Sequence, residues 1–187
     1  MEHGGTVRLE TERLILRRFT VEDAGAMYRN WASDPAVTEF LTWPPHPSED
    51  ATRRLLECWV RDYAKPDHYQ WAIELKSLGE VIGSLSIVRI DEDIDAMELG
   101  WCIGRRWWGQ GIMPEAAAAM FRYLFEEVGV NRIAAKHAVD NPKSGRVMQK
   151  LGMTFEGVLR QVGRSNHGIE DDAQYSMLKS EYTQKNP

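Results

Sequence analysis

The chain has 187 residues, with 23 lysines and arginines against 28 aspartates and glutamates, and a formal net charge of −5 at pH 7. Hydrophobic residues make up 43% of it and charged residues 27%, which is typical of a folded globular domain and excludes disordered and fibrous chains. The acidic balance argues against a nucleic-acid partner, and the longest apolar run is far too short to cross a membrane.

The N-terminus and the cysteines bear on the location of the protein. Residues 1–5 lack the basic start and the apolar stretch of a secretory signal. The two cysteines, Cys58 and Cys102, form no disulfide framework, and neither they nor the five histidines have the spacing of metal ligands. We therefore expect a cytoplasmic protein without a metal site.

In chain order, hydrophobic periodicity and turn residues predict the following elements. The first half is expected to contain a strand over 7–19, a helix from 20–23 to 33–35, a proline-rich loop over 43–47, a helix from 48–50 to 65–67, and hairpin strands over 69–75 and 81–90. The second half is expected to contain a strand over 96–103, a helix that follows a turn at 104–111 and ends at Gly129, a strand over 132–139, a helix over 144–151, and strands over 153–161 and 173–178. This order predicts one mixed α/β domain with a helix-connected parallel strand pair at its centre.

The charge is unevenly distributed along this order. Residues 101–150 contain eight basic and four acidic side chains, a local charge of +4, against −9 for the remainder. The excess is either a compositional fluctuation or the sign of a site for a polyanionic ligand.

A glycine-rich turn between the buried strand and the helix start is the most informative segment. Glycines at 109 and 111 let backbone N–H groups approach a ligand, and the helix start adds unpaired donors and a positive dipole end. Phosphate or pyrophosphate is the natural ligand, although helix-entry glycines often serve backbone geometry alone. A Rossmann fingerprint fails at Pro114, and a Walker A loop fails at Gln110.

The turn resembles that of a third family. Arg106-x-x-Gly109-x-Gly111 matches the signature of the GNAT N-acetyltransferases, whose loop holds the pyrophosphate of coenzyme A. Residues 107–116, 12–17, 140–144 and 150–153 resemble the RimJ/RimL branch, which includes ribosomal-protein N-terminal alanine acetyltransferases. The resemblance covers roughly residues 9–182 and implies a single GNAT domain over residues 1–187.

The resemblance also implies a fold and a cosubstrate, acetyl-CoA. The fold is a mixed, mostly antiparallel central sheet with flanking helices and a parallel strand pair that splays apart. The pantetheine arm would pair with main-chain groups in this gap, as an added strand does. The residues expected to contact acetyl-CoA are Trp101, Cys102, Ile103, Arg105, Arg106, Trp108, Gly109, Gln110, Gly111, Ile112, Met113, Asn141 and Ser144. Both Arg105 and Arg106 could contact acetyl-CoA, or one of the two could point to solvent instead.

Acetyl transfer to an amine requires a neutral nucleophile and a proton for the departing thiolate. The resemblance implies Glu98 as general base, directly or through water, and Ser144 as the group that protonates the thiolate. Glu98 could instead be a strand-edge carboxylate in a salt bridge, and Ser144 a helix N-cap. The tyrosine that serves as acid in many family members is replaced by Met148, which has no proton to donate. An acetyl-enzyme on Cys102 is the less favoured route, because a strand cysteine is usually a small buried hydrophobe.

The sequence therefore predicts an acyltransferase that moves an acetyl group from acetyl-CoA to a primary amine in a ternary complex. The resemblance favours a protein N-terminal α-amine, as in ribosomal proteins. The alternatives are a small-molecule amine, such as a polyamine, an amino acid or an antibiotic, and a CoA-binding module without turnover. A homodimer is a family-level expectation.

Overall fold

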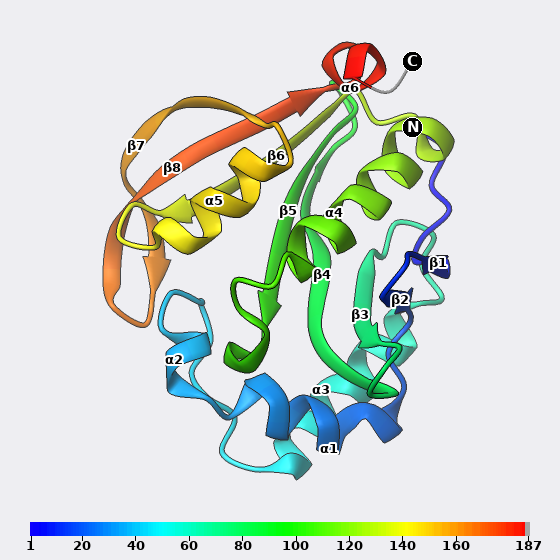
Figure 1. The fold of residues 1–187 in the computed structure, drawn as a ribbon, viewed down its shortest axis with the longest axis vertical. Helices are drawn as coiled ribbons and strands as arrows, with labels where there is room; N and C mark the ends of the chain where they lie inside the picture. The colour runs from blue at the N-terminus through cyan, green and yellow to red at the C-terminus, as the bar shows by residue number, and fades with distance from the viewer. Residues whose placement is uncertain (186–187) are drawn as a thin grey trace.

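The computed structural model describes residues 1–185, which form one eight-stranded sheet with helices on both faces (Figure 1). The strands are β1 (Leu9–Glu10), β2 (Leu14–Arg17), β3 (Gln70–Leu75), β4 (Glu80–Asp91), β5 (Ala96–Ile103), β6 (Arg132–Ala138), β7 (Thr154–Ser165) and β8 (Gly168–Leu178). The α-helices are α1 (Ala24–Met27), α2 (Pro35–Thr38), α3 (Glu49–Asp62), α4 (Ile112–Tyr123), α5 (Pro142–Lys150) and α6 (Lys179–Lys185).

The sheet has the order β1-β2-β3-β4-β5-β6-β8-β7. Every neighbouring pair is antiparallel except β5 and β6, which are parallel. This confirms the predicted mixed α/β fold with a mostly antiparallel sheet and a parallel pair. Across the described residues, no helix has the length and apolar character needed to span a membrane.

The parallel pair separates partway along its length. β5 and β6 are in register from Ala96 with Arg132 to Leu99 with Ala135, and no further pairing follows although both strands continue. β6 pairs instead with β8 on its other edge as far as Ala138. The far half of β5 therefore has a neighbour on one side only, and the gap lies between β5 and the end of β6.

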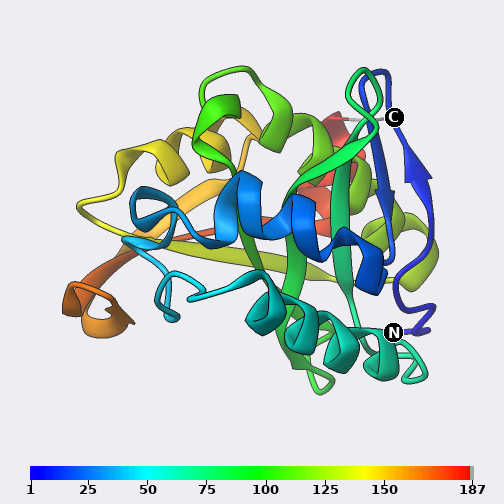
Figure 2. The ribbon, with the colours of Figure 1, turned by 90° about the horizontal axis from the view of Figure 1, so that it is seen from below.

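Two groups of helices bury the two faces of the sheet. Helices α4 and α5 pack on one face, where Leu99, Met120 and Met148 belong to the larger core cluster. Helices α1 and α3 pack on the other face, where Trp31 and Leu56 are fully buried. Figure 2 shows α3 and α5 on opposite sides of the sheet.

The first predicted strand is two strands in the structure. The sequence predicts one half-exposed strand over residues 7–19, but the chain turns at 11–13 between β1 and β2. The Thr11 N–H donates to the Leu14 carbonyl at 3.0 Å, and the Thr11 hydroxyl accepts from the Leu14 N–H at 3.0 Å. The threonine side chain thus closes a tight turn that imperfect alternation along the sequence conceals.

The first helical segment begins where predicted and ends differently. Thr20 and Asp23 form a reciprocal capping box ahead of α1. After α1 the helix widens to a π-turn over Tyr28–Ala32. The separate helix α2 follows, with Asp34 as N-cap accepting from the Ala36 N–H at 2.9 Å. A four-residue helix is too short to produce a periodic pattern.

Later elements follow the prediction in order, but α4 ends at Tyr123 and continues as a π-turn over Leu124–Val128, and helix α6 was not predicted. Two further differences concern α5 and the last hairpin. Helix α5 begins at Pro142 rather than at residue 144, with proline in the first turn where a missing N–H costs nothing. Strands β7 and β8 continue beyond the predicted ends and meet at a tip over residues 165–168. A register shift between Leu159 and Gly163 interrupts the alternation there, which hid the outer half of this hairpin.

Candidate active site

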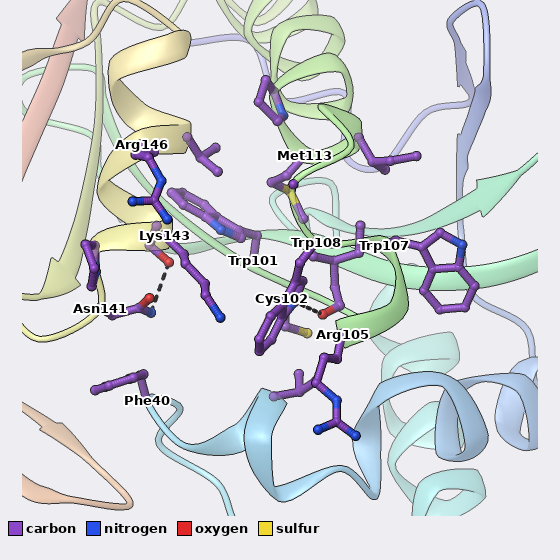
Figure 3. Close-up of a pocket in the computed structure, with 18 of the residues that line it drawn as sticks. Phe40, Trp101, Cys102, Arg105, Trp107, Trp108, Met113, Asn141, Lys143 and Arg146 are labelled. Carbon is purple, nitrogen blue, oxygen red and sulfur yellow. Dashed lines mark hydrogen bonds between the residues drawn. The ribbon is translucent and has the colours of Figure 1, made fainter.

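A cavity of about 840 Å³ lies at the splayed end of β5 (Figure 3). Its walls come from the end of β5, the turn before α4, the start of α4, the face of α5, and the segment of residues 36–41 around α2. The cavity thus joins segments from both faces of the sheet at the place where the two parallel strands separate.

The glycine turn enters the cavity wall in a backbone conformation that requires glycine. Gly109 has a φ of 76° and Gly111 a φ of 73°, both in the left-handed region. Gly111 is the residue before the first turn of α4, so the N–H groups that follow it are unpaired donors at the positive end of the helix dipole. This turn fits an anionic ligand such as a pyrophosphate.

An ion pair behind the turn connects it to the first hairpin. The Arg13 guanidinium donates from Nη1 to the Gln110 carbonyl at 3.0 Å and from Nε to the Glu115 carboxylate at 2.6 Å. Burial alone would raise the pKa of Glu115, but hydrogen bonds from Thr11 and Arg13 outweigh it and lower that pKa. Arg13 therefore fixes the carbonyl at the centre of the turn and the first turn of α4 together.

The backbone of β5 offers unpaired groups beside this turn. Antiparallel pairing directs every second residue of β5 toward β4, as in the bond from the Gly104 N–H to the Ile82 carbonyl at 2.9 Å. The main-chain groups of Trp101 and Ile103 point the other way, past the last paired residues of β6. The Ile103 carbonyl is taken by the Trp108 indole N–H at 2.9 Å (Figure 3).

Cys102 lies on the opposite face of β5 from its two neighbours. It packs against the core cluster of α1 and α3, and its Sγ lies 3.3 Å from the Ser84 hydroxyl. Burial raises the pKa of its thiol to about 11. The thiol is therefore protonated at neutral pH, as expected for a buried small hydrophobe and not for a nucleophile.

Ser144 and Asn141 face the cavity from the start of α5. The Asn141 side-chain amide donates to the Ser144 hydroxyl oxygen at 3.1 Å (Figure 3). Asn141 is the residue that precedes the helix, and Ser144 lies within its first turn, so the reading of Ser144 as an N-cap is wrong. Met148, one turn further, is fully buried in the core.

The two arginines of the turn lie differently. Arg105 lines the cavity and forms an ion pair with Asp34 ahead of α2, with Nε 3.2 Å from Oδ2. Arg106 lies over the Trp107 ring at 5.7 Å, and its carbonyl accepts from the Gln110 side chain at 2.9 Å. The lining of the cavity includes neither Arg106 nor Gln110, and it includes all the other residues expected to contact acetyl-CoA.

Sequence reasoning missed two parts of the cavity wall. Lys143, Arg146 and Lys150 of α5 line it, and the Lys143 ammonium lies 3.9 Å from the centre of the Trp108 ring. Their spacing of three and four residues, from just before the helix predicted over 144–151 to near its end, was the available signal. Residues 36–41, from the other face of the sheet, carried no comparable signal.

Glu98 lies outside the cavity lining, on the face of β5 that Cys102 shares. Its Oε1 is 3.6 Å from the Lys136 ammonium, which is also 3.7 Å from the Asp172 carboxylate. The salt-bridge reading of Glu98 therefore describes a real contact. The Glu98 side chain keeps 21% of its surface exposed, so water has access to it.

Over residues 1–185, the histidine, cysteine and acidic side chains form no group of three or more able to hold a metal ion. The groups that the cavity offers for chemistry are its glycine turn, the backbone of β5, its cations and the Ser144 hydroxyl.

Comparison with known proteins identifies the family. Residues 13–154, well over half of the chain, match the model of the acetyltransferase (GNAT) domain. The uncharacterized N-acetyltransferase p20 of Bacillus licheniformis is 32% identical over 175 residues, 93% of this chain and 97% of that protein. The ribosomal protein uS5-alanine N-acetyltransferase of Escherichia coli (strain K12) is 28% identical over 159 residues, 81% of this chain and 80% of that protein.

The fold is shared with solved acetyltransferase structures. The crystal structure of a GNAT-family acetyltransferase from Bacillus anthracis superposes with a TM-score of 0.81 at 24% identity, over 93% of this chain and 99% of that chain. The resemblance in the glycine turn is thus confirmed by similarity along nearly the whole chain. The chain belongs to the GNAT family of N-acetyltransferases, and its relatives include ribosomal-protein acetyltransferases of the RimJ/RimL type.

Proposed function

We propose that this enzyme transfers the acetyl group of acetyl-CoA directly to the α-amine of a protein N-terminus within a ternary complex. The observation that carries the proposal is one cavity in which a glycine turn suited to a pyrophosphate meets the unpaired backbone of β5. A thioester held at these two places would present its carbonyl at the gap between β5 and β6.

Acetyl-CoA binding can be assigned to three parts of the wall. The N–H groups that follow Gly109 and Gly111 would hold the pyrophosphate, and the main-chain groups of Trp101 would pair with the pantetheine amides. The α5 side supplies positive charge for the ribose phosphate of CoA, from Lys143, Arg146 and Lys150. The local charge of +4 over residues 101–150 supports this placement of a polyanion.

The transfer step needs two proton movements. The neutral amine attacks the thioester carbon, so that a C–N bond forms, the C–S bond breaks and the electron pair leaves on sulfur. The amine loses its extra proton through water to Glu98, because this carboxylate is partly exposed but lies outside the cavity lining. The thiolate takes a proton through the Ser144 hydroxyl, which faces the cavity and regains its proton from water.

The state of Cys102 favours direct transfer. A covalent acetyl-enzyme would need a thiolate, whereas burial raises the pKa of this thiol to about 11. An α-amine also suits a site with modest base assistance. With a pKa near 8, about a tenth of it is neutral at pH 7, compared with less than a thousandth of a lysine side chain.

The proposed acceptor class is supported by the relative that is named ribosomal protein uS5-alanine N-acetyltransferase. Small amines are the second candidate, since the segment around α2 that lines the cavity is a short helix and loop of the kind that diverges between relatives.

A turnover assay separates these candidates. Release of free thiol from acetyl-CoA is followed with a peptide that begins with alanine, the same peptide with a blocked N-terminus, a polyamine and free amino acids. We expect release with the free peptide and none with the blocked one. Turnover only with small amines would assign the second candidate, and calorimetric binding of acetyl-CoA without any turnover would indicate a module that binds CoA only.

A further inference from the structure

The tip of the β7–β8 hairpin contacts the loop that follows α2. In Figures 1 and 2 this tip, far along the chain, lies beside the loop over residues 38–43. Asn166 makes three hydrogen bonds to it: its side-chain amide donates to the Thr38 carbonyl at 2.8 Å and to the Trp43 carbonyl at 2.9 Å, and its backbone N–H donates to the Leu41 carbonyl at 3.1 Å. One residue thus binds both ends and the middle of the loop.

The next residue of the tip adds two side-chain contacts. His167 Nε2 lies 3.0 Å from the Glu39 carboxylate, and its ring stacks on Phe40 with centroids 5.1 Å apart and planes 21° from parallel. The tip therefore holds the loop by its backbone through Asn166 and by its side chains through His167.

The loop has little structure of its own to fix it. It lies between α2, which has four residues, and the proline-rich segment before α3. Its internal support includes the Leu41 N–H donating to the Thr38 carbonyl at 2.8 Å. An irregular segment with few internal bonds is held in one conformation by tertiary contacts, which offset the entropy of ordering it.

The loop forms one wall of the catalytic cavity. Glu39, Phe40 and Leu41 line it, and Figure 3 shows Phe40 and Met113 on opposite sides of it. Met113 belongs to the turn of α4 assigned to the pyrophosphate, on the face that α4 and α5 cover. The loop comes from the face of α1 and α3, which is the face of β5 that carries Cys102 and, by strand alternation, Glu98.

We propose that Asn166 is a positioning residue that holds loop 38–43 in place as the acceptor wall, and so sets the affinity for the acceptor without contacting acetyl-CoA. This inference rests on the proposed function. It assigns the hairpin tip to acceptor binding, although the tip itself is not part of the cavity lining.

The test compares Asn166→Ala, which removes two of the three hydrogen bonds, with Arg164→Ala, an exposed residue of the same hairpin. Hydrogen exchange of residues 38–43, the KM for an alanine-initiated peptide and the Kd for acetyl-CoA are measured for both. In Asn166→Ala we expect loop exchange and peptide KM each to rise about 10-fold, with the Kd within about twofold of wild type. Arg164→Ala should match the wild type in all three.

Three outcomes decide the matter. Unchanged loop exchange and peptide KM in Asn166→Ala would overturn the proposal. A Kd for acetyl-CoA that rises as much as the peptide KM would also overturn it, because the damage would then reach the whole site. If the wild type fails to acetylate the peptide, the proposed acceptor class fails, while loop exchange still decides whether Asn166 holds the wall.

Discussion

At the scale of single residues, the glycine turn combines a backbone requirement with a binding role. Gly111 has a φ of 73°, which L side chains rarely adopt. An aspartate there adds backbone strain, and its Cβ would lie 3.6 Å from Arg13 Nη2, so its negative charge would sit beside the turn and compete for the guanidinium that holds it. Gly79, in the β3–β4 turn, has a φ of 67° and open space around it. A side chain at Gly79 therefore causes similar backbone strain, but far from the cavity.

We expect Gly111→Asp to raise the Kd for acetyl-CoA at least about 10-fold, because the new charge repels the phosphates. Gly79→Asp carries similar strain and should leave the Kd unchanged. Isothermal calorimetry on both variants measures this. Equal affinities in the two variants would remove the turn from the binding site.

Glu98 is assigned as base through water, with Lys136 as its ion-pair partner. Glu98→Gln should lower kcat about 100-fold at pH 7, the lower end for general base catalysis, since part of an α-amine is already neutral there. Activity should recover partly toward pH 9, where free amine is abundant. Glu57→Gln on the exposed surface of α3 is the control. A Glu98→Gln profile that matches the wild type at every pH would exclude Glu98 from the mechanism.

At the scale of elements, the turn that binds the cosubstrate is supported from a distant hairpin. Arg13, between β1 and β2, holds both the Gln110 carbonyl and Glu115 of α4. It lies outside the cavity lining, so its effect on binding is exerted through the position of the turn.

Arg13→Gln should therefore weaken acetyl-CoA binding about 10-fold, because charge-assisted hydrogen bonds of this kind contribute about 1.5–3 kcal/mol. The matched control is Arg8→Gln, which breaks the exposed pair with Glu10 on the same hairpin and should leave binding unchanged. Calorimetric titration with acetyl-CoA compares them. If the two variants bind equally well, the support from the hairpin is not needed.

Elements with regular periodicity could be predicted from the sequence, and those fixed by distant contacts could not. β5 was predicted with its observed bounds because a short apolar run lies between two turns, and α4 because its apolar stripe is regular. Loop 38–43 could not be predicted, since its partner Asn166 is more than a hundred residues away. The same limit applied to Arg13, whose strand pattern says nothing of its contact with Glu115.

At the scale of the whole molecule, the half-buried His68 links stability to pH. Burial lowers the pKa of His68 below its usual value of 6.5, and within the described residues its Nε2 is buried with no hydrogen-bond partner. Protons then bind the unfolded chain more tightly than the folded one. The contribution of His68 to the free energy of unfolding is fully present above about pH 6.5, and it is lost as the pH falls through the folded-state pKa.

The midpoint temperature of thermal unfolding should accordingly decrease as the pH is lowered from 7 to 5. His68→Gln should make this fall less steep, whatever its effect on the midpoint at pH 7, since it removes one group whose protonation favours unfolding. Scanning calorimetry over this range measures both slopes. Identical slopes in the variant and the wild type would show that His68 does not contribute.

The uneven charge of the chain corresponds in part to a cluster of cations in the folded molecule. The basic excess over residues 101–150 includes Lys143, Arg146 and Lys150, which line the cavity. These cations could be counted in the sequence, but their convergence on one cavity depends on how α5 packs beside the splayed strand. Net charge alone would not have located the site.

The central claim is transfer of an acetyl group to an α-amine. The most direct measurement is mass spectrometry of an alanine-initiated peptide after incubation with enzyme and acetyl-CoA, with released thiol counted in the same sample. We predict one acetyl group on the N-terminal amine for each thiol released, and none on lysine side chains of the peptide. Thiol release without acetylated peptide, or acetylation confined to lysine, would contradict the account.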